Sequence, residues 1–239
     1  MFPKELEHFK STLYHKLYSE LDRKQKLEEA VEDLILLFAK EEHLHIANKI
    51  QECYDHWHGI GSAKCATMIW TSIEEVASVI NCALTIDAAE SYEENTNKFR
   101  SYSKYLSINN LRVKDIIEKS IKFVRFLNTS IIAGFEYNTT DRSAYLAVPK
   151  SSMWDQKVGT QLRIANLVSA SANEASVDEF KNDDNYIILK FNIKEGCCNA
   201  GMINKFGKSK YPDKDETLLP PYTFVTFKSI DPRGKYRFQ

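Results

Sequence analysis

The chain has 239 residues, of which 43% are hydrophobic and 27% are charged, and its formal net charge is −1. This composition predicts a folded globular chain and excludes an extended disordered one. The near-neutral charge argues against a nucleic-acid partner bound through bulk positive charge, and the lack of any run of about 18 apolar residues argues against a membrane partner.

Residues 1–130 are predicted to form a helical lobe. Apolar side chains recur at spacings of three and four over residues 27–38, and again over residues 44–50. This spacing matches the period of one helical face, so each stretch is expected to form an amphipathic helix.

Two further helices are predicted in this lobe from their start signals. Thr71 stands three residues before Glu74, a hydroxyl–glutamate spacing that is typical of a helix start. Asn109 and Asn110 precede an amphipathic stretch over residues 116–127, which we expect to be the last helix of the lobe.

Residues 131–239 are predicted to form a β lobe. Short apolar or alternating segments stand at residues 144–148, 161–168, 186–193 and 223–227. In the third segment, alternation puts four apolar side chains on one face: Ile187, Leu189, Phe191 and Ile193. Strands joined by loops rather than helices favour a mostly antiparallel sheet or sandwich, so the expected fold class is α+β. We expect one domain over residues 1–239.

The histidines and cysteines do not predict a metal site. All six histidines stand in the first 58 residues, and the pairs His43/His45 and His56/His58 are each two residues apart. On a helix this spacing turns the two side chains about 200° apart, so neither pair shares a face. The cysteine count is odd, at five, and no pair has zinc-ligand spacing.

The start of the chain shows no apolar core of a signal peptide. Together with the odd cysteine count, this favours a reduced, cytoplasmic protein. A secreted protein from which a signal peptide had been removed would have the same sequence, and that alternative stays open.

A pair of serines and a single glutamate stand at the edges of two predicted strands. Ser169 and Ser171 have the same parity, so both point to one face of their strand. Glu216 stands 47 residues after Ser169 and opens another strand, within Lys-Asp-Glu-Thr-Leu-Leu-Pro-Pro-Tyr-Thr at residues 214–223. Glutamate is uncommon in strands, so Glu216 either caps an exposed strand edge or forms a site together with the serine pair.

This arrangement resembles the mono-ADP-ribosyltransferases of the arginine–serine–glutamate clade. The family's final signature is an acidic turn, a glutamate, an aliphatic strand and often Pro-Pro-aromatic, and Ser169-Ala170-Ser171 matches its Ser-Thr-Ser strand. Ala175 and Phe180 stand where the family tends to have an alanine and a phenylalanine. Ser-Ile-Asn-Asn-Leu-Arg at residues 107–112 is similar to the asparagine–arginine segment before the family's first catalytic strand.

The resemblance implies a β-sandwich of ADP-ribosyltransferase type after the helical lobe, with NAD as substrate and an unidentified protein as acceptor, and without a metal. Glu216 would stabilise the positive charge that develops on the ribose when nicotinamide leaves, and Ser169 would orient Glu216. Cofactor-binding positions would be Ser171, Tyr145 and Leu146. Ser171 would also support the end of its strand.

The loop before Glu216 corresponds to the family's substrate-recognition turn, and the resemblance implies acceptor contacts at Phe206, Tyr211 and Lys214. An exposed loop without a binding role would have the same composition. In enzymes that modify arginine, the family has a glutamate where Lys214 stands. A charged lysine cannot accept a proton and repels a cationic acceptor, so arginine modification is not expected.

A second departure concerns the family's dinucleotide-binding arginine, which corresponds to Leu146. Leucine cannot bind a pyrophosphate. Arg142, Lys150 and Arg163 are the nearby cations, and the sequence selects none of them. Three hypotheses follow: an NAD-dependent transferase or glycohydrolase, an inactive relative that serves as a binding module, and an unrelated helical-plus-β protein.

Overall fold

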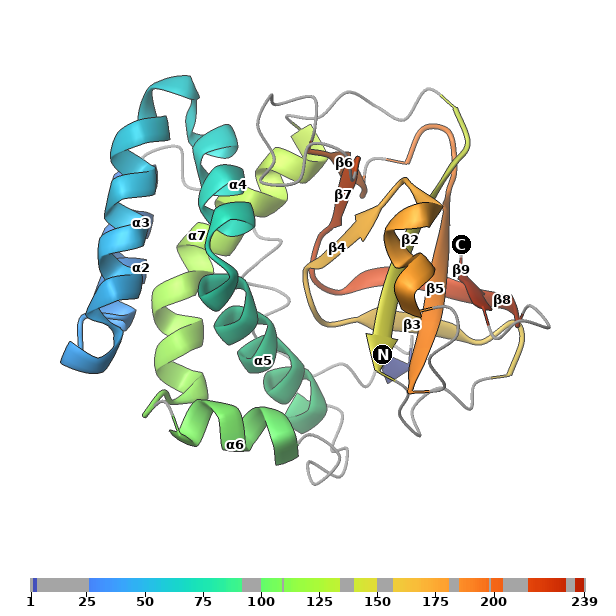
Figure 1. Cartoon of the computed structure of the whole chain (residues 1–239), viewed down its shortest axis with the longest axis horizontal. Helices are drawn as coiled ribbons and strands as arrows, with labels where there is room; N and C mark the ends of the chain where they lie inside the picture. Colours follow the sequence, from blue (N-terminus) through green and yellow to red (C-terminus); the bar gives the residue numbers. More distant parts are fainter. Residues whose placement is uncertain are drawn as a thin grey trace. The chain divides into compact units, whose positions relative to one another are not determined.

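A computed structural model describes residues 2–3, 26–91, 100–108, 110–133, 140–149, 157–180, 185–197, 199–203, 215–230 and 235–238. The chain divides into two compact units (Figure 1). The helical unit comprises Leu6–Ser130, and the β unit comprises Met1–Glu5 together with Ile131–Gln239.

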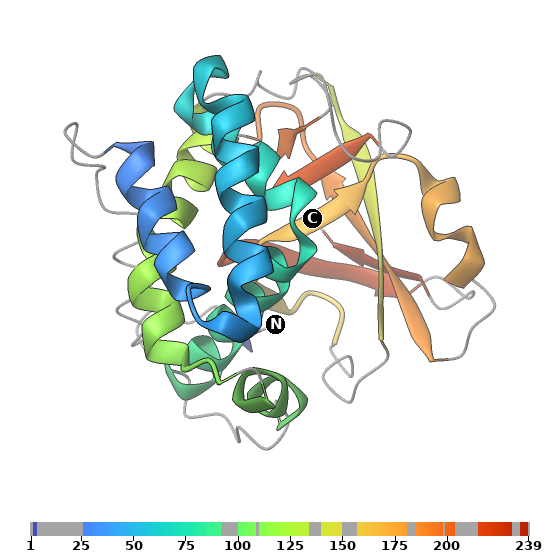
Figure 2. The ribbon, with the colours of Figure 1, turned by 60° about the vertical axis from the view of Figure 1, so that its left-hand side comes forward.

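The helical unit contains α2 (Leu27–Leu37), η2 (Glu41–His43), α3 (Leu44–Trp57), η3 (His58–Ile60), α4 (Ser62–Ser72), α5 (Glu74–Ser91), α6 (Arg100–Ile108) and α7, which begins at Val113 and ends at Ala133. α2 and α3 lie side by side (Figures 1 and 2). Among the described residues no single helix is long and apolar enough to cross a membrane. α4 and α5 together meet that criterion, but they meet at a bend of 94°.

The periodic segments form the helices that their spacing predicts. α2 buries Leu27, Ala30, Val31, Leu34 and Leu37, which is the apolar face of the 27–38 pattern. The predicted start near Thr71 falls at the junction of α4 and α5. There Thr71 donates its hydroxyl to the Thr67 carbonyl, 3.0 Å away within α4, so it does not cap α5.

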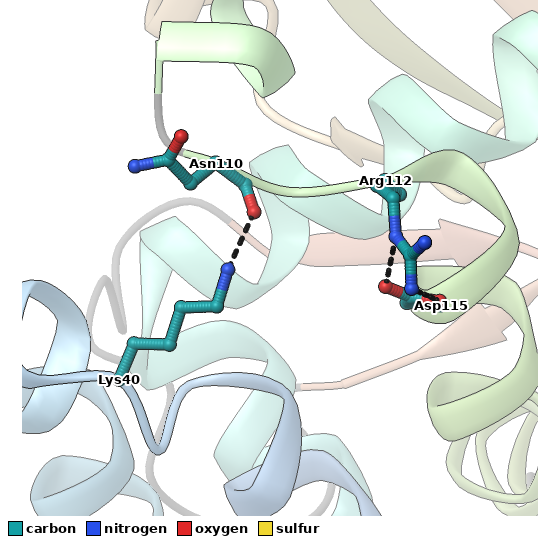
Figure 3. Close-up of polar contacts among 4 residues, drawn as sticks. All are labelled: Lys40, Asn110, Arg112 and Asp115. Atoms are coloured by element: carbon teal, nitrogen blue, oxygen red, sulfur yellow. Dashed lines mark hydrogen bonds and ion pairs between the residues drawn. The ribbon is translucent and has the colours of Figure 1, made fainter.

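The turn from α6 into α7 is fixed by polar contacts within the helical unit (Figure 3). Asn110 has a φ of 52°, a left-handed conformation that asparagine tolerates. Lys40 Nζ donates to the Asn110 carbonyl at 2.9 Å. Arg112 then donates to both carboxylate oxygens of Asp115, from Nε at 2.7 Å and from Nη2 at 2.9 Å. The turn is therefore held on both sides as α7 begins.

The β unit contains β1 (Phe2–Pro3), β2 (Arg142–Pro149), β3 (Gln161–Ile164), β4 (Val168–Ser171), η6 (Glu174–Phe180), β5 (Tyr186–Ile193), β6 (Gly201–Met202), β7 (Glu216–Leu219), β8 (Thr223–Ile230) and β9 (Lys235–Phe238). The described strands pair in the order β1-β3-β8-β9-β5-β2-β4-β7-β6. Of these pairs, only β5–β9 is parallel. The expected α+β class, with helices first and antiparallel strands after, is confirmed.

One apolar cluster fills the β unit and draws its side chains from β2, β3, β4, β5, β7 and β8. The alternation in β5 predicts its share of this cluster, because Ile187, Leu189, Phe191 and Ile193 all belong to it. The segment 161–168 was expected to form one strand, and that expectation is wrong. It breaks after Ile164, so that β3 pairs with β8 while β4 pairs with β2 and β7.

Candidate functional site

Ser169 and Glu216 come together on one face of the paired strands β4 and β7. The antiparallel register sets Ser171 opposite Glu216 and Ser169 opposite Leu218, so Ser169 is the diagonal neighbour of Glu216. The Ser169 hydroxyl donates a hydrogen bond to Glu216 Oε1. Ser169 is exposed and Glu216 is partly buried, so solvent reaches a carboxylate whose orientation is fixed by a neighbouring hydroxyl.

The backbone around Glu216 is held from both sides. Its carbonyl accepts a hydrogen bond from the Ile203 amide at 2.8 Å, just after β6. The carbonyl of the preceding residue, Asp215, accepts one from the Ala172 amide at 2.9 Å, just after β4. Glu216 therefore starts β7 as a central strand between β4 and β6, rather than capping an exposed edge.

Asp215, the residue before β7, has a φ of 41°. This left-handed conformation has its highest steric cost for β-branched residues. We therefore expect Asp215→Val to lower the free energy of unfolding by about 1–2 kcal/mol. Asp215→Gly removes the steric cost and is expected to lower it less than valine does. Denaturant unfolding of both variants measures this difference, and equal losses would contradict a conformational cause.

Ser171 completes the end of β4. Its hydroxyl accepts a hydrogen bond from the Asn173 amide at 3.1 Å, and Asn173 Oδ1 accepts one from the Ala175 amide at 3.0 Å. These two bonds turn the chain out of β4 and into η6. Ser171 is buried. Its hydrogen bond with the Asn173 amide stabilises the end of β4.

Tyr145 shares the face of Ser171 and Glu216 but lies under η6. It pairs with Ser171 across β2 and β4, and its buried ring belongs to a small cluster with Val177 of η6 and Ile188 of β5. Figures 1 and 2 show η6 against this face of β2 and β5. On the β5 side, Lys190 Nζ lies 5.4 Å from the centre of the Tyr145 ring.

Leu146 lies on the opposite face of β2, where it packs against the main apolar cluster. The structure therefore does not bring it to the side of Ser169 and Glu216. The β2 residues on that side are Ser143, Tyr145, Ala147 and Pro149, none of which is a cation. A difference of one residue in register turns every side chain of a strand to the other face. Leu146, the position expected to match the family's arginine, therefore lies on the core side of β2.

The Pro-Pro-Tyr segment is the turn that joins β7 to β8. Tyr222 is 2% exposed and has a φ of 62°, which is unusual for a bulky residue. Its carbonyl accepts a hydrogen bond from Arg163 Nη1 of β3 at 3.1 Å. Arg163 thus anchors this turn, from the face of β3 opposite to Leu162 and Ile164, which belong to the main apolar cluster.

Phe206, Tyr211, Lys214 and Lys150 lie outside the described residues. Sequence reasoning missed one contact close to the site: Arg142 Nη1 donates to Thr217 Oγ1 at 3.0 Å, from the face opposite Glu216. Parity places Arg142 on the Leu146 face, but a contact across two strands depends on sheet twist, which the sequence pattern does not give.

The described part of the chain holds no group of three histidine, cysteine or acidic side chains able to bind a metal ion. Burial raises the pKa of Cys65 to about 12, and that of Cys53 and Cys82 to about 11. Such thiols are protonated at neutral pH and are poor nucleophiles.

No protein-family model and no curated protein sequence matches the chain. Solved structures do match it. The type III effector XopAI from Xanthomonas axonopodis pv. citri gives a TM-score of 0.58 at 13% identity, covering 99% of this chain and 92% of that one. Exoenzyme S from Pseudomonas aeruginosa, solved with human 14-3-3 protein beta and carba-NAD, gives 0.51 at 8% identity, covering 89% and 87%.

ADP-ribosyltransferases are also among the similar structures. Plx2a, an ADP-ribosyltransferase toxin from Paenibacillus larvae, gives a TM-score of 0.46 at 15% identity, covering 79% of this chain and 90% of that one. The match to XopAI, over 99% of this chain, is the one that shows an ADP-ribosyltransferase-like fold, with an N-terminal helical region followed by antiparallel β-sheets.

Proposed function

We propose that this chain cleaves the nicotinamide–ribose bond of NAD and transfers ADP-ribose to a protein side chain, or to water as a glycohydrolase. The observation that carries the proposal is the hydrogen bond from Ser169 to Glu216 on an accessible face of an ADP-ribosyltransferase-like fold. We assign the site to the arginine–serine–glutamate clade, with its arginine position altered.

The proposed step is a heterolytic cleavage at the ribose C1′. The C1′–N bond breaks, its electron pair leaves with nicotinamide, and the ribose becomes an oxocarbenium-like cation. The Glu216 carboxylate stabilises that cation and accepts a hydrogen bond from the adjacent ribose hydroxyl. The acceptor then bonds to C1′ and releases its proton to solvent or to a nearby base.

Ser169 is proposed to hold the carboxylate in the orientation that this step needs. Ser169→Ala removes the donor, and a hydrogen bond to a charged group contributes about 1.5–3 kcal/mol. We expect nicotinamide release to fall about 10- to 100-fold, with little change in stability because Ser169 is exposed. Turnover and thermal unfolding of the purified variant measure both effects, and unchanged turnover would contradict the proposed role.

The acceptor is proposed to be something other than arginine. Lys214 stands two residues before Glu216, where enzymes that modify arginine carry a second carboxylate. Its positive charge would repel a guanidinium and could not take its proton. A panel of acceptor proteins labelled with ADP-ribose, followed by mapping of the modified side chain, tests this. Modified arginine would contradict it.

A second candidate function is a binding module that retains the fold without turnover. The β2 residues on the Glu216 side are Ser143, Tyr145, Ala147 and Pro149, and none of them is a cation. This favours the binding module, because the dinucleotide phosphates then have no charged partner on that strand. Nicotinamide release by the purified protein separates the two functions. Release supports the enzyme, and binding of ADP-ribose without release supports the module.

A further inference from the structure

Arg142 contacts β7, the strand that begins at Glu216, on the face of the sheet opposite to the Glu216 side chain. It is the first residue of β2, and its guanidinium crosses the buried face of the sheet to Thr217, the residue after Glu216. Between them on this face lie Ala144 and Ala170, whose side chains are methyl groups in the apolar cluster. Small side chains at these two positions leave room for the long arginine arm.

The bond to Thr217 is the main anchor of this cation. Arg142 Nε and Nη2 are buried and have no hydrogen-bond partner among the residues that the structure describes. Burial also lowers the pKa of the guanidinium. Thr217 itself is 0% exposed. Separating the pair would leave a buried hydroxyl and a buried cation both unsatisfied, which is costly for each group.

We infer that Arg142 is a positioning residue that holds Thr217 from the core side and thereby fixes Glu216 against Ser169. Successive residues of a strand point to opposite faces, so a constraint on Thr217 sets the backbone from which the Glu216 side chain leaves. The catalytic part of this inference rests on the proposed function. The structural part, a constraint on the start of β7, does not.

Amide hydrogen exchange tests the structural part directly. The Ile203 and Ala172 amides donate to the carbonyls of Glu216 and Asp215, so their exchange reports the start of β7. We expect Arg142→Met and Thr217→Val each to speed exchange at these two amides about tenfold or more, relative to the β5 amides of the same variant. Thr217→Val preserves shape, so it supplies the test if Arg142→Met folds poorly.

Arg163→Met is the matched control, because Arg163, like Arg142, is an arginine of the β unit with a buried Nε, and its Nη1 donates to the Tyr222 carbonyl. It is expected to leave the relative exchange of the Ile203 and Ala172 amides unchanged. The double variant Arg142→Met/Thr217→Val should be no worse than either single variant, since both remove one interaction.

Kinetics test the catalytic part. We expect Arg142→Met and Thr217→Val to lower kcat for NAD cleavage about tenfold with KM unchanged, because neither side chain lies on the Glu216 face, and Arg142→Lys to restore part of the loss. Unchanged relative exchange in both variants, or additive losses in the double variant, would overturn the inference. Wild-type protein that releases no nicotinamide would refute the proposed enzyme, and the exchange results would still decide the role of Arg142.

Discussion

Replacing Glu216 by glutamine is expected to lower nicotinamide release from NAD by at least about 10²–10³-fold. Glutamine keeps the size of the side chain and can still meet the Ser169 hydroxyl, but it carries no negative charge. An oxocarbenium-like ribose would then form without its counter-charge. The fold should be preserved, because Glu216 is only partly buried and the hydrogen bond from the Ile203 amide to its carbonyl remains.

Glu195→Gln supplies the control for this experiment. Glu195 is an exposed glutamate of the same β unit, in the turn after β5, and its substitution makes the same change in charge and shape. Its turnover is expected to equal that of the wild type. If Glu216→Gln retained full nicotinamide release, or if Glu195→Gln lost as much, the role given to Glu216 would be wrong.

The second large effect is expected in the core of the β unit. Phe227 of β8 is 0% exposed and belongs to the main apolar cluster. Phe227→Ala removes most of its side chain and leaves a cavity that close-packed neighbours fill only in part. We expect the free energy of unfolding to fall by about 3–5 kcal/mol. Denaturant unfolding monitored by circular dichroism measures this loss.

Phe224→Ala is the matched control on the same strand, because Phe224 is 39% exposed. Its ring centre lies 5.8 Å from the Arg163 guanidinium, and the exposed ring keeps this contact partly hydrated, which weakens it. We expect a loss below about 1 kcal/mol. Similar losses in the two variants would contradict the assignment of Phe227 to the core.

The sequence predicts an element well where one of its faces is buried and the other is not. β5 satisfies this condition, and its alternating apolar residues all enter the cluster. α4 does not, because every side chain from Cys65 to Trp70 is buried. A helix without a polar face shows no period of 3.6 residues, so no pattern marked it.

The break between β3 and β4, within residues 161–168, could not be predicted from the sequence for a related reason. β3 and β4 each bury apolar side chains, so their sequence resembles one continuous strand. Only their partners differ: β3 pairs with β1 and β8, whereas β4 pairs with β2 and β7. Strand pairing is a long-range property, and a local pattern carries little information about it.

The candidate site was likewise predicted only in part, because its assembly depends on strand pairing. The parity of Ser169 and Ser171 and the placement of Glu216 at the start of a strand follow from local sequence, and the structure joins Ser169 to Glu216. The face of β2 that shares this site depends on a register that is unknown from sequence, and Leu146 falls on the other side. The Arg142–Thr217 contact depends on twist as well.

The most direct measurement is a crystal structure of the protein with carba-NAD, in which a carbocycle replaces the nicotinamide ribose so that nicotinamide is not released. We expect the hydroxyl groups of that carbocycle to lie within hydrogen-bond distance of the Glu216 carboxylate, on the face of β4 and β7 where Ser169 is exposed. A dinucleotide bound on another face of the β unit, or a saturated crystal with no ligand at Glu216, would contradict the proposed site.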